Sequence, residues 1–303
     1  TLLESYGVLI QRFEDFDDHL MAITRIMRAE EWIPSTPRHI LLYRAFGWMP
    51  PVYVHLPLIL APNGKGKLSK RHGATAIAEF RQKGYLPEAI FNFLALLGWA
   101  YDDKAEIMSR EEIIQRFSLE GVSKSPAACS YKKLEWMNGQ YIRSLPPREL
   151  ARRLQPVMRS HILPEDFGTV LRLVPLIQER IKVLSDAIPL VDFIFAESLD
   201  YEPKLLIGKR MDAAQSLKAL RFVRDCLECL PEWTALAVEE PLYNLAGELG
   251  LKPGQLFGIV RVAATGRTVA PPLFATLEVI GREKALARID RALVALEGLL
   301  AAD

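Results

Sequence analysis

The sequence predicts a mainly helical protein with a small α/β segment near its amino terminus. Half of the 303 residues are hydrophobic, a strand-like run lies near residues 50–62, and apolar residues follow helical spacing after residue 75. Charged residues make up 25% of the chain, which disfavours intrinsic disorder. No apolar run approaches the roughly 18 to 20 residues that span a bilayer, and a chain of this length typically forms two or three domains.

The overall charge is nearly balanced. Lys and Arg number 38 against 37 Asp and Glu, which leaves a net charge of +1. Many nucleic-acid binders carry a large basic excess, so any site for a polyanion in this chain must be a local patch. The amino-terminal residues also lack the pattern of a secretory signal.

The three cysteines favour a reducing cytosol, because an odd number cannot form a closed disulfide framework. Cys226 and Cys229 form a CxxC pair, whereas Cys129 is remote and no histidine stands near the pair. Structural zinc needs four ligands, so we predict no metal site. The i, i+3 spacing instead predicts that both thiols line one buried helix face.

The first elements predict the end of an α/β domain. A helix is expected over HILLYRAF, with Ser35 or Thr36 as its cap and Pro37 in its first position. The run PPVYVHLPLILAP that follows is rich in Val, Ile and Leu and is bracketed by prolines, which predicts one short buried strand.

The next segment predicts helices. One is expected between Pro87 and Gly98, and Ser109 with Glu112 forms a capping box for a second. KKLEWMNGQYIRSL is expected to form a helix or helix pair, and SLPPREL indicates a domain boundary near residue 145.

The remaining half is expected to be helical throughout. No fixed-period repeat appears, so an antiparallel bundle or cage in two lobes, divided near residue 209, is favoured over a solenoid. An amphipathic closing helix is expected, with an apolar stripe at Leu286, Ile289, Leu293, Leu296 and Leu300 and basic residues around it at Arg282, Lys284, Arg288 and Arg291.

The loop GKGKLSKRHG, residues 64–73, is the most informative segment. Its glycines let the backbone approach a ligand closely, and its lysines suit a polyphosphate. The spacing is not that of a Walker loop. An exposed basic turn has the same composition, so composition alone leaves both interpretations open.

Four motifs in one order carry a family resemblance. LILAPNGKGKLSKRHGAT resembles the second signature loop of class I aminoacyl-tRNA synthetases, in the KLSKR form of glutamyl-tRNA synthetases. MRAEEWIPSTPRHILLYRAFGW before it, and KGYLPEAIFNFLALLGW and LEWMNGQYIR after it, resemble the same family. The helical second half resembles the bacterial type, in which a helical cage reads the anticodon, rather than the relatives with β-barrel anticodon domains.

The resemblance implies four parts. Residues 1–65 would be the end of a Rossmann-type catalytic domain, and 66–145 the KLSKR loop with a helical stem-contact domain. Residues 146–209 and 210–303 would be the two lobes of an all-α anticodon-binding cage. A cytoplasmic monomer with no membrane partner and no zinc in this portion is expected.

The activity implied by the resemblance is that of a glutamate–tRNA ligase. ATP, with Mg²⁺, and L-glutamate would form glutamyl adenylate, and the acyl group would pass to the terminal adenosine of the glutamate tRNA. Lys70 would contact the ATP phosphates in the transition state, while Lys67 and Ser69 would shape the loop. Such catalysis consists mainly of positioning and electrostatic stabilisation.

Two further catalytic-domain residues follow from the resemblance. Arg28 matches the arginine that meets the substrate glutamate, for which a bidentate guanidinium–carboxylate pair gives the rationale. Glu31 matches a residue of the ATP site. Without the family match, these would be an ordinary helix-end arginine and a solvated carboxylate.

The resemblance also implies residues that contact tRNA. Arg180 matches an arginine that meets the third anticodon base, and Arg143 lies in a motif near the inner bend of the tRNA, where the neighbouring Trp136 is expected in the core. The other anticodon bases would be approached from the last lobe, where the candidates are Lys252, Gln255, Arg261 and Arg267. Each of these could instead be a solvated surface residue.

The family's other signature, H-x-G-H, does not occur among the five histidines. The first sixteen residues also depart from the family pattern, and a tyrosine expected to touch glutamate has no counterpart. This chain is therefore expected to be an incomplete portion that is inactive alone, whether as an expressed fragment, a protein with an unseen amino-terminal half or a truncated gene product. Two alternatives stay open: a stand-alone, non-catalytic tRNA-binding module and a helical interaction protein.

Overall fold

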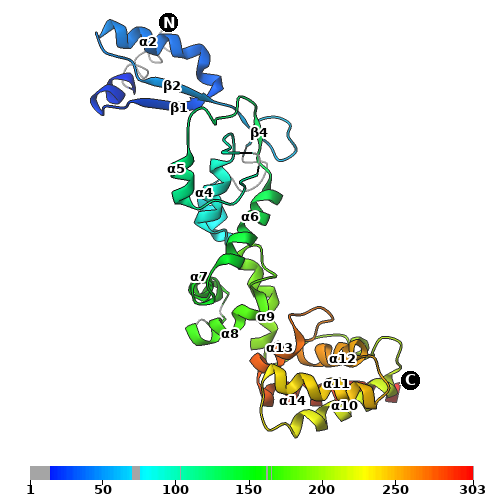
Figure 1. Cartoon of the computed structure of the whole chain (residues 1–303). Coiled ribbons are helices and arrows are strands. Elements are labelled where there is room, and N and C mark those ends of the chain that lie inside the picture. The colour runs from blue at the N-terminus through cyan, green and yellow to red at the C-terminus, as the bar shows by residue number, and fades with distance from the viewer. Residues whose placement is uncertain (1–13, 70–75, 103, 162, 165, 303) are drawn as a thin grey trace. The chain divides into compact units, whose positions relative to one another are not determined.

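The computed structural model describes residues 14–69, 76–102, 104–161, 163–164 and 166–302. It divides into two compact units, Thr1–Asn138 and Gly139–Asp303, with the boundary inside helix α6 (Tyr131–Ser144). Short parallel strands occur in the first unit and helices dominate throughout the described residues (Figure 1). The prediction of a mainly helical protein with a small α/β segment is confirmed, while the domain boundaries expected near 65, 145 and 209 stay predictions.

A β-α-β arrangement opens the first unit. Strand β1 (Arg25–Ala29) pairs in parallel with β2 (Val52–Leu56), in a register that sets Arg28 opposite His55. The connection contains η1 (Glu30–Ser35) and α2 (Thr36–Ala45), and Figure 1 shows α2 alongside the two strands. Parallel strands need such a crossover, because a tight turn cannot join them.

The segment before β1 is anchored to α2 by a buried polar contact. His39 Nδ1 of α2 lies 2.9 Å from Asp15 Oδ1, and both side chains are buried. Ser35 occupies the N-cap position of α2, as predicted, but its side chain forms no capping hydrogen bond with the helix amides. The hydroxyls of Ser35 and Thr36 both donate to the Trp32 carbonyl instead.

The single buried strand predicted for PPVYVHLPLILAP is wrong in two respects. The run is broken at Pro57 into β2 and a two-residue strand, β3 (Ile59–Leu60), and the residues of both strands are half-buried or exposed. Proline lacks the amide hydrogen that a strand ladder requires. After the break, β3 pairs in parallel with β4 (Ala127–Ala128) instead of β1.

Helices complete the first unit, in the order α3 (Ile77–Gln82), α4 (Pro87–Ala95), α5 (Arg110–Arg116) and the first part of α6. Phe93 of α4 packs against Leu134 and Met137 of α6 in the buried core. The capping box of α5 is confirmed: Glu112 N donates to Ser109 Oγ at 3.2 Å, and Ser109 N donates to Glu112 Oε2 at 2.8 Å.

Trp136 does not belong to that core. Its side chain is 40% exposed, whereas the neighbouring Met137 is fully buried. The core position predicted for Trp136 is therefore wrong, because consecutive residues of a helix point about 100° apart and Met137 takes the inward direction.

The second unit is all-helical in its described residues. Helices α7 and α8 pack together, as do α10 and α14. The elements are α7 (Pro147–Ser160), α8 (Phe167–Ile177), η3 (Leu184–Ala187), α9 (Ile188–Phe195), η4 (Pro203–Leu206), α10 (Ala213–Glu228), α11 (Ala235–Glu248), α12 (Pro253–Thr265), α13 (Leu273–Ile280) and α14 (Arg282–Ala302).

The amphipathic closing helix is confirmed as α14, but Arg288 is not on its solvated face. The side chain is buried, and its guanidinium donates to the carbonyls of Ala264, Phe193 and Ala196 at 2.7 to 2.8 Å. These bonds join α14 to the ends of α9 and α12. A buried guanidinium is tolerated when most of its donors are satisfied; within the described residues, Arg288 Nη1 and Nη2 have partners and Nε has none.

The buried thiol face predicted for α10 is also wrong. Cys226 is half-buried and Cys229 exposed, and both line a surface pocket between α10 and α11. Among the residues that the structure describes, no group of three or more His, Cys, Asp or Glu side chains could hold a metal ion. The helices of that same part of the chain include none long and apolar enough to cross a membrane.

Candidate functional site

The glycine- and lysine-rich loop folds back on β3. Ala61 N donates to Gly66 O at 2.9 Å and Leu68 N to Ile59 O at 2.9 Å, which closes the loop over residues 61–66. Gly64 and Gly66 have φ values of 72° and 73°, a left-handed conformation that residues with a Cβ rarely adopt. The two glycines thus allow the tight return that brings Lys67 back opposite Leu60.

The side chain of Lys67 forms an ion pair with the carboxylate of Glu31. Its Nζ lies 2.9 and 3.0 Å from the two carboxylate oxygens of Glu31, which stands in η1 directly after β1. Both side chains are about half exposed, at 60% and 47%. Such an exposed ion pair contributes little stability, so it is free to be exchanged for contacts to a ligand.

Arg28 lies on β1, three residues before Glu31, and is held by its neighbours. Its Nη2 donates to Thr36 Oγ1 at 2.8 Å, and its guanidinium carbon lies 5.0 Å from the centre of the Tyr53 ring and 5.7 Å from that of Trp32. Arg28 Nε is buried and has no hydrogen-bond partner in the part of the chain that the structure describes. The guanidinium is therefore held in one direction, with one N–H group that no described residue accepts from.

The same contacts determine the protonation of His55. Thr36 Oγ1 donates its single hydrogen to Trp32 O, so the 3.0 Å contact with His55 Nε2 requires that nitrogen to be the donor. Burial, and then the positive charge of Arg28, lower the pKa of His55. His55 is therefore neutral near pH 7 and orients Thr36 without adding charge.

Ser69 and Lys70 are the other two loop residues predicted for the catalytic site. Ser69 is exposed directly after Leu68 and makes polar contacts of its own. Lys70 lies outside the described residues. Of the predicted catalytic-domain residues, the structure thus joins Lys67, which follows β3, to Glu31, which follows β1, while Arg28 lies near the carboxyl end of β1 in contact with Thr36, Tyr53 and Trp32. The carboxyl ends of parallel strands are where α/β folds bind ligands.

Gln178, which was not among the predicted residues, connects the backbone segments that carry Arg143 and Arg180. Gln178 Nε2 donates to the carbonyls of Ile142, Arg143 and Leu145 at 3.0, 3.3 and 2.8 Å. It ties the end of α8 to the end of α6. Arg180 follows two residues later, with an exposed side chain that has no hydrogen bond or ion pair to any described residue.

Lys252 and Gln255 lie together at the start of α12. The Lys252 side chain is exposed, and its backbone amide donates to Gln255 Oε1 at 3.0 Å. Gln255 Nε2 donates to the Lys209 carbonyl at 2.7 Å. The amide of Gln255 is thus engaged inside the protein, while Lys252 faces solvent.

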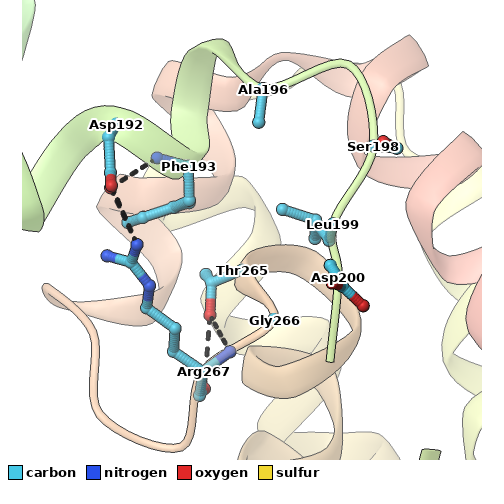
Figure 2. Close-up of a pocket in the computed structure, with 9 residues that line it drawn as sticks. All are labelled: Asp192, Phe193, Ala196, Ser198, Leu199, Asp200, Thr265, Gly266 and Arg267. Carbon is cyan, nitrogen blue, oxygen red and sulfur yellow. Dashed lines mark hydrogen bonds and ion pairs between the residues drawn. The ribbon is translucent and has the colours of Figure 1, made fainter. Parts of the chain in front are cut away.

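Arg261 and Arg267 lie toward the other end of α12. Arg261 Nε is buried without a hydrogen-bond partner among the described residues. Arg267 points toward α9, where its Nη2 lies 2.9 Å from Asp192 Oδ1 (Figure 2). Its Nη1 donates to Pro189 O. The helix rise of 1.5 Å per residue separates Lys252 from Arg267 by about 20 Å, so these candidates form two groups.

Two family profiles match adjacent stretches of the chain. Residues 14–136 match the tRNA synthetases class I (E and Q), catalytic domain, and residues 149–293 match the anticodon binding domain. The glutamate–tRNA ligase of Dehalococcoides mccartyi strain CBDB1 is 50% identical to the chain over 285 residues. The chain belongs to the glutamate–tRNA ligase family.

Other members agree in sequence and structure. The glutamate–tRNA ligase of Roseiflexus castenholzii is 50% identical over 303 residues. A crystal structure of a glutamate tRNA ligase from Elizabethkingia meningosepticum, in complex with its amino acid, superposes with a TM-score of 0.82 at 32% identity and covers 93% of this chain. The chain spans 58% of the Dehalococcoides relative, 60% of the Roseiflexus relative and 59% of the crystallised chain.

The candidate residues are divided between the two matched family domains. Arg28, Glu31 and Lys67 fall in the catalytic-domain match, and Arg180 falls in the anticodon-domain match together with the candidates of α12. Arg143 lies between the two matches. The first group therefore lies in the catalytic-domain match, and most of the second group lies in the anticodon-domain match.

Proposed function

We propose that the protein to which this chain belongs is a glutamate–tRNA ligase, which attaches L-glutamate to glutamate tRNA through glutamyl adenylate. The observation that carries the proposal is the ion pair of Lys67 with Glu31, which joins the glycine-rich turn after β3 to the segment directly after β1, the strand that carries Arg28. It supports an anion-binding catalytic site because a glycine-rich turn and a cation lie near the carboxyl end of a parallel strand that carries a second cation.

Arg28 is the proposed contact for the substrate carboxylate. A guanidinium can hold a carboxylate with two parallel hydrogen bonds, and Arg28 keeps a buried donor without a protein partner. Thr36 and the rings of Tyr53 and Trp32 hold the guanidinium in place. This pre-orders the side chain, so that binding glutamate requires little further ordering.

Lys67, Ser69 and Lys70 are the proposed contacts and supports for ATP, with Glu31 beside them. In the present arrangement Glu31 neutralises Lys67. When phosphates arrive, Lys67 can turn from the carboxylate to them, at small cost because the pair is exposed. A glycine-rich turn with exposed ammonium groups fits a polyphosphate, and the Mg²⁺ that accompanies ATP would neutralise further phosphate charge.

The second unit is the proposed tRNA-binding part. Arg180 has an exposed, uncommitted guanidinium, which suits stacking on a splayed base or hydrogen bonding to its edge. Arg143 and the α12 candidates Lys252, Gln255, Arg261 and Arg267 are proposed to support the same RNA. We further propose a monomer that works in the cytoplasm.

Glutamate-dependent exchange of pyrophosphate into ATP tests the first half of the reaction. The assay uses this chain joined to the part of the Dehalococcoides relative that it does not span, with the 303-residue chain alone in parallel. The joined protein should exchange pyrophosphate with glutamate and not with aspartate, and the chain alone should show no exchange. Exchange that does not depend on glutamate would contradict the proposed substrate.

A further inference from the structure

A strained turn connects η4 to α10. Met211 N donates to Gly208 O at 2.9 Å, which closes a turn over Gly208–Met211. Within it, Arg210 has a φ of 63°, a left-handed conformation that residues other than glycine seldom adopt. Residues held in such a conformation cluster at ligand-binding sites, where the surrounding structure enforces the strain.

Two helices hold this turn in place. Gly208 N donates to Ser216 Oγ of α10 at 2.9 Å, and Gln255 Nε2 of α12 donates to Lys209 O at 2.7 Å. Gly208 is also confined, because a Cβ at that position would lie 2.5 Å from Met211 Sδ. The direction in which the turn presents Arg210 is therefore determined by the fold.

Arg210 opens on a surface pocket of about 340 Å³ that is lined with cations and has no acidic lining residue. Lys218 of α10 lines it as well, and Lys209 and Lys252 stand beside it through their backbone contacts with Gln255. None of these four side chains makes an ion pair or hydrogen bond with a described residue. The nearby carboxylate of Asp212 caps α10 by accepting from Gln215 N at 2.7 Å.

We propose that this pocket binds phosphate, and specifically a phosphodiester group of the tRNA backbone; this part rests on the proposed function. Uncompensated cations in a concave site attract anions, and a guanidinium with adjacent ammonium groups matches the charge and shape of phosphate. Among the described residues, no carboxylate forms an ion pair with any of these four cations. Gln255 is thereby assigned as a positioning residue, which holds the turn from α12.

The pocket is separate from Arg261 and Arg267. It lies at the start of α12, whereas by the helix rise Arg261 lies about 9 Å farther along the helix than Gln255, and Arg267 follows the end of the helix. Phosphate contacts fix the register and orientation of a nucleic acid without reading its sequence. This pocket therefore contributes affinity that is the same for all tRNAs.

Two variants of the 303-residue chain test the site, and a third is a matched control. Arg210→Gly removes the charge and suits the left-handed backbone, so its melting temperature should be equal to or above that of the unchanged chain. Lys218→Ala removes a second lining cation from an exposed helix position. Lys204→Ala removes the same charge from η4, outside the pocket lining.

Filter binding is measured with glutamate tRNA and with a tRNA of unrelated anticodon, at 50 to 200 mM salt. Arg210→Gly and Lys218→Ala should each weaken binding of both tRNAs by about 5- to 10-fold near 100 mM salt, and should lower the slope of log K against log salt by about 1. Lys204→Ala should change both quantities less. In parallel, inorganic phosphate is titrated against the chain and followed by NMR.

The outcomes separate the possible failures. Variants that behave like Lys204→Ala would overturn the inference while leaving tRNA binding intact, whereas a chain that binds no tRNA would sink the RNA-binding part of the proposed function as well. A loss confined to one tRNA would indicate a base contact and overturn the phosphate assignment. If inorganic phosphate binds and Arg210→Gly abolishes this without any effect on tRNA, the source is free phosphate, and the assignment to RNA is wrong.

Discussion

At the scale of single residues, the candidate catalytic site combines one fixed cation with one exchangeable cation. Arg28 is held by Thr36 and two aromatic rings, whereas Lys67 is paired with the exposed carboxylate of Glu31. The fixed group suits a substrate that must be oriented. The exchangeable group suits phosphates whose charge changes during the reaction.

We expect Lys67→Ala to reduce glutamate-dependent pyrophosphate exchange about 100-fold in the joined protein, because a cation aimed at developing phosphate charge is lost. Stability should change by less than about 1 kcal/mol, since the ion pair with Glu31 is exposed. Exchange rates and denaturant unfolding check the two parts. Lys65→Ala, two residues away on the same loop, is the control, and an equal loss in both variants would refute a specific role for Lys67.

The raised pKa of Tyr53 predicts that the free energy of unfolding depends on pH above about pH 10. Burial, and then the charge of Asp15, raise its pKa to about 12, and its hydroxyl is buried without a hydrogen-bond partner among the described residues. The unfolded chain ionises near pH 10 and the folded chain does not, so the stability contributed at this site falls as the pH rises from about 10 to 12. Tyr53→Phe should therefore match the unchanged chain at pH 8 and become the more stable of the two above pH 10.

Urea unfolding at pH 8, 9.5 and 11 measures this difference. Tyr101→Phe serves as the control, because that tyrosine is exposed. A Tyr53→Phe chain whose stability relative to the unchanged chain is the same at all three pH values would show that the Tyr53 hydroxyl is not shielded as described.

At the scale of elements, helix ends were predictable where the signal is local. The capping box of Ser109 and Glu112 and the proline starts of α2 and α4 depend on neighbouring residues alone. The broken strand after Leu56 was not predicted, because its apolar run looks continuous and only the pairing of β3 with β4 shows that the chain leaves the first sheet.

Ser109→Ala should destabilise the first unit by about 1 kcal/mol, because the amide of Glu112 loses its acceptor at the start of α5. Ser118→Ala, which removes an exposed hydroxyl near the other end of that helix, should cost less. Hydrogen exchange of the α5 amides, together with denaturant unfolding, checks the effect. Equal exchange in both variants would show that the cap contributes nothing.

At the scale of the whole molecule, the resemblance predicted more of the site than residue patterns could. Arg28, Glu31 and Lys67 stand in motifs whose order is informative, although only the fold brings Lys67 to Glu31. The contact of Thr36 with His55 depends on the parallel register of β1 and β2, which spacing does not reveal. The hydrogen bonds of Gln178 and the burial of Arg288 were not predicted, because a polar residue in a helix is normally expected to face solvent.

Arg288 is the main polar connection of α14 to the rest of the second unit. Arg288→Met should destabilise that unit by at least about 3 kcal/mol, because three carbonyls lose a buried donor. Arg291→Met is the matched control, since Arg291 is exposed on the same helix and donates to the single carbonyl of Glu197. Thermal and urea unfolding measure both, and a similar small loss in the two variants would contradict the role given to Arg288.

The proposed attachment of glutamate to tRNA is tested by measuring how much labelled glutamate the protein transfers to tRNA. Labelled glutamate, ATP and total tRNA are incubated with the chain joined to the part of the Dehalococcoides relative that it does not span, and the charged tRNA is identified by hybridisation. We expect glutamate to appear on glutamate tRNA, and we expect excess unlabelled aspartate not to compete. A well-folded joined protein that attaches no glutamate to any tRNA would contradict it.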